Sequence, residues 1–278
     1  MTGWAPTTAL VTGASSGIGR GVALALARRG LRVIAAARRS DALAQLADES
    51  AGRIVALPLD VTDDDQLRAL PARLGESGAS VDLLINNAGY ACAGPLEDVS
   101  LDDIRRQFDV NLVGLIGVTQ AVLPAMRAAR RGRIVNVSSV AGIVSLPFLG
   151  VYCASKFAVE GVSDALRLEL KPFGIEVRIA EPAAIASDFA NVTHNRATAP
   201  SSVYARWYCP QALRDASEAN AAPVAVAVDV IVDLSLAARH RARLTFPARG
   251  RRLVTMRRML PVSTFDKILA RRFGLNRS

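Results

Sequence analysis

The sequence predicts an α/β protein: a single doubly wound domain over residues 1–278, with a parallel seven-stranded sheet and helices on both faces. Two observations predict it. Apolar runs bounded by turn residues alternate regularly with stretches of helical periodicity. The runs are almost continuously apolar, which is typical of strands in a parallel sheet covered on both faces. No internal repeat or low-complexity linker divides the 278 residues.

We expect strands at 8–13, 31–37, 53–61, 81–89, 132–139, 175–182 and 241–247. We expect helices at 17–30, 40–50, 63–74, 100–126, 151–171 and 224–239. After residue 187 the pattern loosens. Residues 188–222 mix aromatic and proline residues with small polar ones, so we expect a substrate lobe there, followed by a basic C-terminal tail at 248–278.

The first strand runs directly into a glycine-rich turn, "TGASSGIGRG", that opens the first helix. Its glycines are spaced Gly-x-x-x-Gly-x-Gly. They let the backbone turn tightly and approach a pyrophosphate, which then sits at the positive end of the helix. This placement predicts a dinucleotide site.

The end of the second strand indicates which dinucleotide binds. An enzyme that selects NAD places an acid here to accept hydrogen bonds from the ribose. This chain has Ala37, Arg38 and Arg39 instead, and an arginine can pair with a 2′-phosphate. Arginine is abundant in this chain, so the missing acid is the stronger observation. We expect NADP(H) to be preferred over NAD(H), with Arg38 binding the phosphate.

Tyr152 and Lys156 lie four residues apart in an expected helix, and only three of the 34 basic residues are lysines. At this spacing the two side chains share a helix face. A free phenol has a pKa of about 10, and a compact ammonium nearby lowers it. We therefore expect Lys156 to lower the pKa of Tyr152 for acid–base chemistry. The alternative is a chance pair on the protein surface, and it applies only if no other motif of the chain indicates a functional site at these residues.

The motifs together resemble those of the short-chain dehydrogenase/reductase family. They are Thr12-Gly13-x-x-x-Gly17-x-Gly19, "NNAG" at 86–89, Ser139, and Tyr152-x-x-x-Lys156, in order over roughly residues 7–187. The resemblance implies a Rossmann-type fold and an NAD(P)-dependent enzyme acting on CH–OH donors. The long basic C-terminus is similar to that of the retinol and hydroxysteroid dehydrogenase-like branch.

The resemblance also implies catalytic roles. Tyr152 is the expected general acid or base, and Lys156 also holds the nicotinamide ribose hydroxyls. Ser139 hydrogen-bonds the substrate oxygen. Ser138 is the rival for this role, or alternatively a strand-end hydroxyl that caps backbone, and the family pattern favours Ser139. Asn111 kinks a helix and holds a proton-relay water; alternatively it is an interior Asn that bonds backbone.

The cofactor is expected to contact residues from six segments of the chain. These are Gly13, Ser15, Ser16, Gly17, Ile18, Gly19, Arg38, Asp60, Val61, Asn87, Ala88, Gly89, Tyr152, Lys156, Pro182, Ile185 and Ser187. Asp60 has a second interpretation as a helix-capping acid. The chain departs from the family at Ala183, where a glycine usually follows the proline, and Ser187 stands where a threonine usually lies.

The sequence therefore predicts an NADP(H)-dependent oxidoreductase that interconverts a lipophilic ketone or aldehyde and its alcohol. Apolar and aromatic walls are expected from 91–100 and 188–222. The alternatives are an epimerase or dehydratase on the same scaffold, or a non-catalytic cofactor-binding regulatory protein.

Cysteine usage and charge indicate location and partners. Three cysteines at no metal-ligand spacing predict reduced thiols and no metal site. We expect a cytoplasmic protein without a secretory signal or a segment long and apolar enough to span a bilayer. By resemblance we also expect a homo-oligomer, either a dimer or a tetramer.

Residues 239–278 carry eleven arginines, one lysine and one acid, a net +11 against +9 for the whole chain. Phe265, Ile268, Leu269 and Phe273 form an apolar stripe at helical spacing there, with Ser263 and Asp266 as an expected capping pair. The stripe either packs on the protein's own core or docks on an anionic membrane or an acidic carrier protein. Nucleic acid is not expected, because no recognition motif accompanies the charge.

Overall fold

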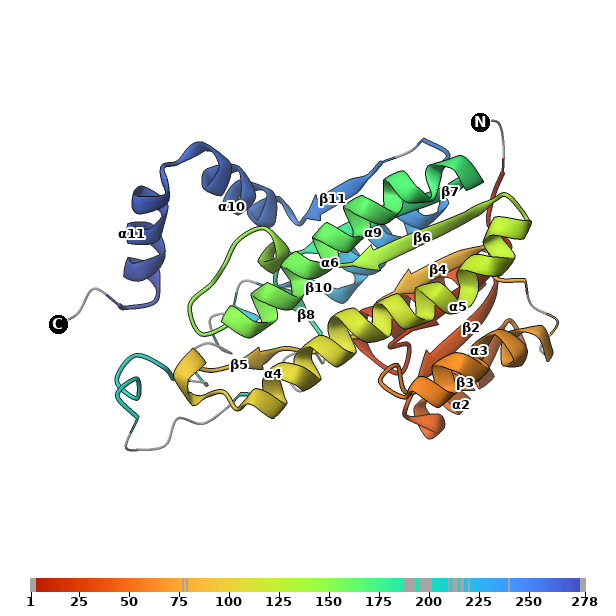
Figure 1. The fold of residues 1–278 in the computed structure, drawn as a ribbon, viewed down its shortest axis with the longest axis horizontal. Helices are drawn as coiled ribbons and strands as arrows, with labels where there is room; N and C mark the ends of the chain where they lie inside the picture. The colour runs from red at the N-terminus through yellow and green to blue at the C-terminus, as the bar shows by residue number, and fades with distance from the viewer. Residues whose placement is uncertain are drawn as a thin grey trace.

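The computed structural model describes residues 4–76, 78, 80–187, 194–195, 202–209, 211, 215, 218–219, 221–239 and 241–275. A seven-stranded sheet in the order β11-β7-β6-β4-β1-β2-β3 forms its centre (Figure 1). Every pairing in this sheet is parallel. The predicted doubly wound α/β fold is confirmed.

The strands of this sheet lie within the predicted runs. They are β1 Thr8–Thr12, β2 Arg32–Ala37, β3 Ile54–Pro58, β4 Leu83–Asn86, β6 Gly132–Val137, β7 Ile175–Pro182 and β11 Arg243–Phe246. Two short parallel pairs lie outside the sheet, β5 Cys92–Ala93 with β9 His194–Asn195 and β8 Ile185–Ala186 with β10 Ala222–Pro223. The predicted fourth strand, 81–89, ends at Asn86, because its last residues form a loop over the sheet edge.

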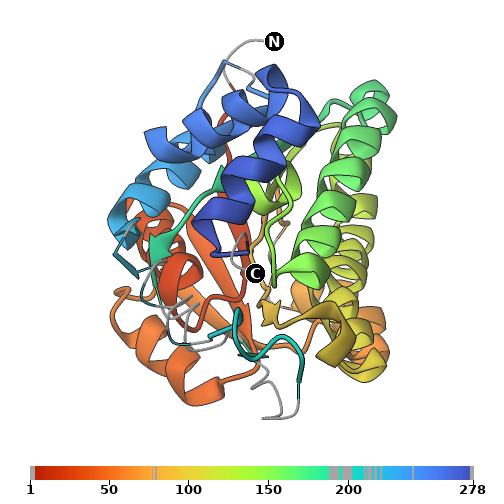
Figure 2. The same ribbon diagram turned by 90° about the vertical axis from the view of Figure 1, so that its left-hand side faces the viewer.

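Helices α1 to α6 and α9 divide between the two faces of the sheet, whereas α10 and α11 follow β11 and extend beyond it (Figures 1 and 2). They are α1 Gly17–Arg28, α2 Ser40–Asp48, α3 Asp64–Glu76, α4 Leu101–Phe108, α5 Gly114–Ala128, α6 Gly150–Glu169, α9 Val224–Leu236, α10 Ala248–Met259 and α11 Val262–Arg272. Alternate residues of each central strand enter opposite cores. In β1, Ala9 and Val11 pack with α1 and α9, whereas Leu10 packs with α3 and α5.

The expected helix 100–126 is interrupted. A π-helical turn, η2 Asp109–Val113, joins α4 to α5. The continuous run Leu101–Ala128 is long and apolar enough to cross a membrane by length and composition alone. The expectation that no segment reaches that length is therefore wrong, although a helix packed on a core passes the same test.

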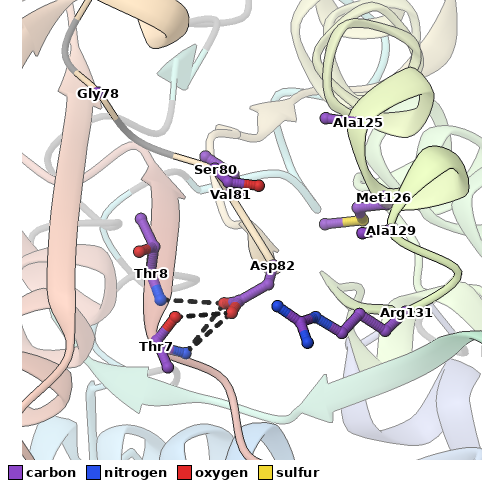
Figure 3. A pocket seen from close by; sticks show the side chains of 10 residues that line it. All are labelled: Thr7, Thr8, Gly78, Ser80, Val81, Asp82, Ala125, Met126, Ala129 and Arg131. Atoms are coloured by element: carbon purple, nitrogen blue, oxygen red, sulfur yellow. Dashed lines mark hydrogen bonds between the residues drawn. The ribbon is translucent and has the colours of Figure 1, made fainter.

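The amino-terminal ends of β1 and β4 are joined by one buried carboxylate. Asp82 accepts hydrogen bonds from the Thr7 and Thr8 amides at 2.9–3.1 Å and from the Thr7 hydroxyl at 2.8 Å (Figure 3). A small pocket beside it is partly lined by Arg131. These contacts set the register of the two strands at the edge opposite the glycine turn.

The basic tail folds into two helices, of which α10 was not predicted. Phe265 and Leu269 of α11 are buried against Val140, Val144 and Val254.

The stripe therefore packs largely on the protein's own core, although Ile268 stays 38% exposed. The predicted capping pair of Ser263 and Asp266 is wrong, because α11 begins at Val262 with Pro261 before it.

Candidate active site

A cleft of about 700 Å³ opens at the carboxyl ends of the central strands. Most predicted site residues line it: Gly13, Ser15, Ser16, Gly17, Ile18, Arg38, Asp60, Val61, Asn87, Ala88, Gly89, Ser139, Tyr152, Lys156, Pro182, Ile185 and Ser187. Two predicted residues, Gly19 and Asn111, lie behind its wall. Parallel strands end at one edge, so residues far apart in sequence meet there.

The glycine turn is shaped by close backbone approach. Gly13 has φ +65° and Gly17 φ +53°, both in the left-handed region that favours glycine. A Cβ on Gly19 would lie 2.3 Å from the Gly13 carbonyl oxygen and 2.4 Å from Asn87 Nδ2. The Asn87 amide in turn donates to the Thr12 carbonyl at 3.1 Å. Gly19 therefore packs the turn against the 86–89 loop.

These residues fit a dinucleotide. Helix α1 begins at the cleft, and its N-cap residue Ser16 makes no side-chain capping bond. The first helical N–H groups are thus available to an anion, and the dipole favours a pyrophosphate there. Between Gly13 and Gly19 the largest side chain is Ile18, so this part of the turn leaves space for the pyrophosphate.

Two arginines follow β2 at the cleft edge, and no carboxylate stands between them and the strand. Arg38 and Arg39 both line the cleft and are exposed. Arg39 donates from Nε and Nη2 to Ser15 Oγ at 3.2 and 3.1 Å. Only Arg38 was predicted from the sequence to bind the phosphate, although Arg39 directly follows it.

Asp60 does not cap a helix. Its carboxylate accepts from the Thr62 amide at 3.0 Å and hydroxyl at 2.8 Å within a loop. Asp63 instead accepts from the Asp65 and Gln66 amides at the start of α3. The helix-capping interpretation of Asp60 is wrong, and its loop lies against the cleft.

Ser139, Tyr152 and Lys156 converge on one wall of the cleft. The Tyr152 phenol and the Ser139 hydroxyl are hydrogen-bonded. Ser139 Oγ also donates to the Pro182 carbonyl at 3.2 Å and accepts from the Ala141 amide at 3.1 Å. These bonds fix the direction of the serine hydroxyl beside the phenol.

Lys156 is held by the end of β6. Its Nζ donates to the Val137 carbonyl at 2.9 Å and lies 5.9 Å from the centre of the Tyr152 ring. Burial raises the pKa of Tyr152 to about 12, and the Ser139 hydrogen bond only partly offsets this. The expectation that Lys156 lowers this pKa does not hold here, since desolvation of the phenolate outweighs other effects.

Asn111 lies in the π-helical turn, and its side chain bonds the neighbouring loop. Its Nδ2 donates to the Tyr90 carbonyl and to Ser155 Oγ, both at 3.0 Å, and its Oδ1 accepts from the Tyr90 amide at 3.1 Å. A π turn breaks the regular helical ladder and is frequent at functional sites. The predicted kink exists, and the side chain itself bonds backbone.

The last cofactor segment follows β7. Ala183, the departure from the family pattern, donates its amide to the Phe246 carbonyl at 2.7 Å. Its Cβ lies 3.0 Å from where a Cβ of Gly250 would stand. The extra methyl group is therefore accommodated by a glycine in the first turn of α10.

The substrate side of the cleft is mostly apolar. It is lined by Tyr90, Ala91, Ala93, Val110, Val140, Ala141, Leu146 and Leu149, with the charged residues Arg106 and Glu218. The sequence predicted an apolar wall from residues 91–100, and Ala91 and Ala93 of that segment do line the cleft. The remaining apolar residues of the wall were not predicted.

The aromatic residues that the structure describes within 188–222 do not line the cleft. Tyr208 is buried and donates to the Ala93 carbonyl at 3.0 Å, and Tyr204 and Trp207 lie elsewhere. From the described part of this segment Glu218 and Ala221 reach the cleft. Residues 188–193, 196–201, 210, 212–214, 216–217 and 220 lie outside the described residues.

The three cysteines are free thiols, with Cys92 and Cys153 buried and Cys209 exposed. In the part of the chain that the structure describes, no group of His, Cys, Asp and Glu side chains could hold a metal ion.

Comparison with known proteins identifies the family. The short chain dehydrogenase model matches residues 7–197. The chain is 38% identical to a 3-ketodihydrosphingosine reductase of Bacteroides thetaiotaomicron over 186 residues, which cover 67% of this chain and 66% of that protein. It is 38% identical to Retinol dehydrogenase 8 of Homo sapiens over 193 residues, 66% of this chain and 61% of that protein. The chain thus spans just under two thirds of the length of these relatives.

A solved structure is similar along most of the chain. A short chain dehydrogenase/reductase from Burkholderia phymatum in complex with NAD superposes with a TM-score of 0.81 at 28% identity, covering 93% of this chain and 95% of the other. The matching family model, the fold and these relatives agree: the chain belongs to the short-chain dehydrogenase/reductase family, within its retinol dehydrogenase-like branch, and is an NAD(P)-dependent oxidoreductase.

Proposed function

We propose that the protein interconverts a lipophilic ketone or aldehyde and the corresponding alcohol, with NADP(H) as the preferred cofactor. The observation that carries this proposal is the hydrogen-bonded pair of Tyr152 and Ser139 on the wall of the cleft, with Lys156 behind it. When bound, the cofactor supplies or accepts the hydride.

Tyr152 is the proton donor in the reductive direction. With a pKa raised to about 12 by burial, the phenol keeps its proton at neutral pH. It can therefore protonate a carbonyl oxygen as negative charge develops there. Ser139 donates its single hydroxyl proton to the same oxygen when that proton turns away from the Pro182 carbonyl, while the bond from the Ala141 amide holds its Oγ in place. Lys156 places a positive charge beside the pair and holds the ribose hydroxyls.

The preference for NADP(H) rests on the end of β2. Arg38 and Arg39 stand at the cleft edge without an opposing acid, and Arg39 already bonds Ser15. Guanidinium groups bind phosphate through paired hydrogen bonds. We assign the 2′-phosphate to both arginines.

A lipophilic substrate fits the mostly apolar wall formed by Tyr90, Val110, Leu146 and Leu149. The names of the two relatives, a 3-ketodihydrosphingosine reductase and a retinol dehydrogenase, denote lipid-like substrates. We propose that 1–278 is one domain and that 188–222 forms its substrate lobe.

The experiment for this function measures reduction of a panel of lipophilic ketones and aldehydes with NADPH and NADH. Tyr152→Phe removes only the hydroxyl and should reduce turnover by about 10²-fold or more, with cofactor binding nearly unchanged. Substantial residual turnover would reject Tyr152 as the donor.

Replacing both arginines, Arg38→Ala with Arg39→Ala, should weaken NADPH far more than NADH in a fluorescence titration. Equal weakening of the two cofactors would place the phosphate elsewhere.

We also propose a homo-oligomer, formed through the helices that carry Asn111 and the Tyr152–Lys156 pair. Leu101, Val113, Phe157 and Leu168 leave large apolar side chains exposed on α4, η2 and α6, which contact one another as neighbours (Figures 1 and 2). Covering such side chains in a partner contact is favourable. A stable monomer in sedimentation at micromolar concentration would reject this.

The remaining partner proposal is a peripheral contact of a cytoplasmic protein with an anionic membrane. Although the α11 stripe is mostly buried, Met259 and Val262 are exposed at the α10–α11 junction. Arg271 and Arg272 are exposed near the end of α11. Exposed apolar and basic residues together favour an anionic lipid surface.

Vesicles of anionic and of neutral lipid distinguish the outcomes. The protein should co-sediment with anionic vesicles, less so after Arg271→Glu with Arg272→Glu, and unchanged after Arg28→Glu with Arg29→Glu on α1. Equal binding to both lipids, or none, would reject the membrane and leave an acidic carrier protein as the partner to examine.

A further inference from the structure

A partly buried acidic network lies behind the Tyr152–Lys156 pair, on the side of α6 that faces β7 and β11. We define it as Glu160 and Asp164 of α6, Glu181 of β7 and Arg243 of β11. Glu160 follows Lys156 by one helical turn, so the network begins one turn from the active-site lysine.

Arg243 is the centre of this network. Its Nη2 lies 2.6 Å from Asp164 Oδ1 and 3.5 Å from Glu160 Oε2, and its Nε lies 3.6 Å from Glu181 Oε1. The Thr245 hydroxyl donates to the other oxygen of Glu181. Three carboxyl groups thus share one guanidinium. Asp164 also pairs with Arg167, whose Nη1 lies 2.5 Å from its Oδ1, so within this network Glu160 and Glu181 depend on Arg243 for a positive partner.

Glu160 is the group with the fewest bonds. It is 7% exposed, and both carboxylate oxygens are buried without a hydrogen bond of normal geometry. The hydroxyl of Ser138, also buried and without such a bond, faces it. A Cβ on Gly142 would lie 2.8 Å from Ser138 Oγ and 3.0 Å from Glu160 Cγ, so this site is closely packed. A buried carboxyl group left this way is costly and calls for a functional explanation.

Glu160 and Lys156 interact electrostatically. Burial lowers the pKa of Lys156 to about 8, and the Glu160 carboxylate opposes this by raising it. Burial also raises the pKa of Glu160 to about 7; Glu181 and Asp164 raise it further, whereas Ser138 and Arg243 lower it. The two groups therefore titrate in neighbouring pH ranges, and the ionised Glu160 carboxylate favours the charged form of Lys156.

We infer that Glu160 is a positioning residue for Lys156: its carboxylate, held by Arg243, keeps the lysine an ammonium while it supports Tyr152. Glu160 does not touch the substrate side of the cleft. It acts through Lys156, whose ammonium is buried and would otherwise lose its proton within the working pH range.

This inference rests on the proposed function only for its catalytic consequence, so its test measures the lysine directly. The chain has three lysines, Lys156, Lys171 and Lys267. Protein labelled with ¹³C at the lysine ε-carbon should give three resolvable signals, assigned by Lys156→Met. Their shifts are followed from pH 6 to 10 in the folded protein without substrate or cofactor.

Glu160→Gln keeps the shape and removes the charge. The Lys156 titration should move to lower pH by about one unit, and the alkaline limb of the turnover profile should move with it. The matched control is Glu169→Gln, the same change at an exposed position of the same helix, which should leave the Lys156 signal in place. An unmoved Lys156 titration in Glu160→Gln, or an equal shift in the control, would overturn the inference.

If Glu160→Gln does not fold, the Asp164→Asn variant tests the coupling between Glu160 and Lys156 instead. Asp164 is partly exposed and raises the pKa of Glu160 by repulsion. Removing its charge favours ionised Glu160, so the Lys156 titration should move to higher pH, the opposite direction. A downward shift or none would refute the coupling. Because no turnover is needed, this result stands or falls separately from the reaction proposed above.

Discussion

We expect Lys156, a proposed catalytic residue, to reduce the stability of the folded protein. Burial lowers its pKa from the ordinary 10.5 to about 8. At about 1.4 kcal/mol per pKa unit, this difference corresponds to a penalty of about 3 kcal/mol for the charged form. Lys156→Met removes the charge and keeps an unbranched chain of similar length. The lost hydrogen bond to the Val137 carbonyl costs about 1 kcal/mol, so we expect a net stabilisation of about 2 kcal/mol at pH 7.

The stabilisation by Lys156→Met should depend on pH and become smaller as the pH rises. The folded-state pKa of Lys156 lies below its unfolded value, so between pH 8 and 10.5 the unfolded chain binds more protons. Wild-type stability from this group therefore rises with pH across that window. The advantage of Lys156→Met should be largest below pH 8 and shrink by about 2 kcal/mol towards pH 9.5.

The assay is urea unfolding followed by circular dichroism at pH 7 and pH 9.5, with turnover measured on the same samples. Lys171→Met, at an exposed lysine, controls for general loss of a positive charge and should change stability by less than about 0.5 kcal/mol. A Lys156→Met variant that is less stable than wild type at pH 7, or equally changed at both pH values, would refute the argument from burial.

Two further changes test the cofactor turn and the tail. Gly19→Ala should abolish dinucleotide binding, because the added methyl group would overlap the Gly13 carbonyl and the Asn87 side-chain amide. A fluorescence titration measures this binding. Tight binding by the variant would show that the turn can relax. Phe265→Ala should lower the free energy of unfolding by about 3–5 kcal/mol, because the Phe265 ring is 3% exposed. Ile268 is 38% exposed, so Ile268→Ala should lower it by about 1 kcal/mol or less. Equal losses would mean that α11 does not pack on the core by this face.

Local residue order predicted much of the fold. The central strands follow from continuous apolar runs, because a strand buried on both faces needs apolar side chains on both. The glycine turn was predicted because only glycine fits a left-handed backbone such as that of Gly13 at φ +65°. The Tyr152–Lys156 spacing was readable because a helix places residues i and i+4 on one face.

Two local features were predicted only in part or wrongly. The π turn at Asp109–Val113 was expected only as a kink, and the capping of α11 was expected at the wrong residues. Contacts between residues distant in sequence were not predictable from local patterns. Arg39 was passed over, because its bond to Ser15 forms only when β2 lies beside β1.

The sequence by itself determined the strands, the glycine turn and the spacing of the proposed acid–base pair, because each depends on residues within a few positions of one another. Only the tertiary structure decided the protonation of that pair. The pKa of a buried group depends on how much water the whole fold removes from it and on charges brought from other elements. Tyr152 is held at a pKa of about 12 rather than lowered. Glu160 meets Glu181 and Arg243 because α6, β7 and β11 pack together, and no spacing along the chain records that meeting.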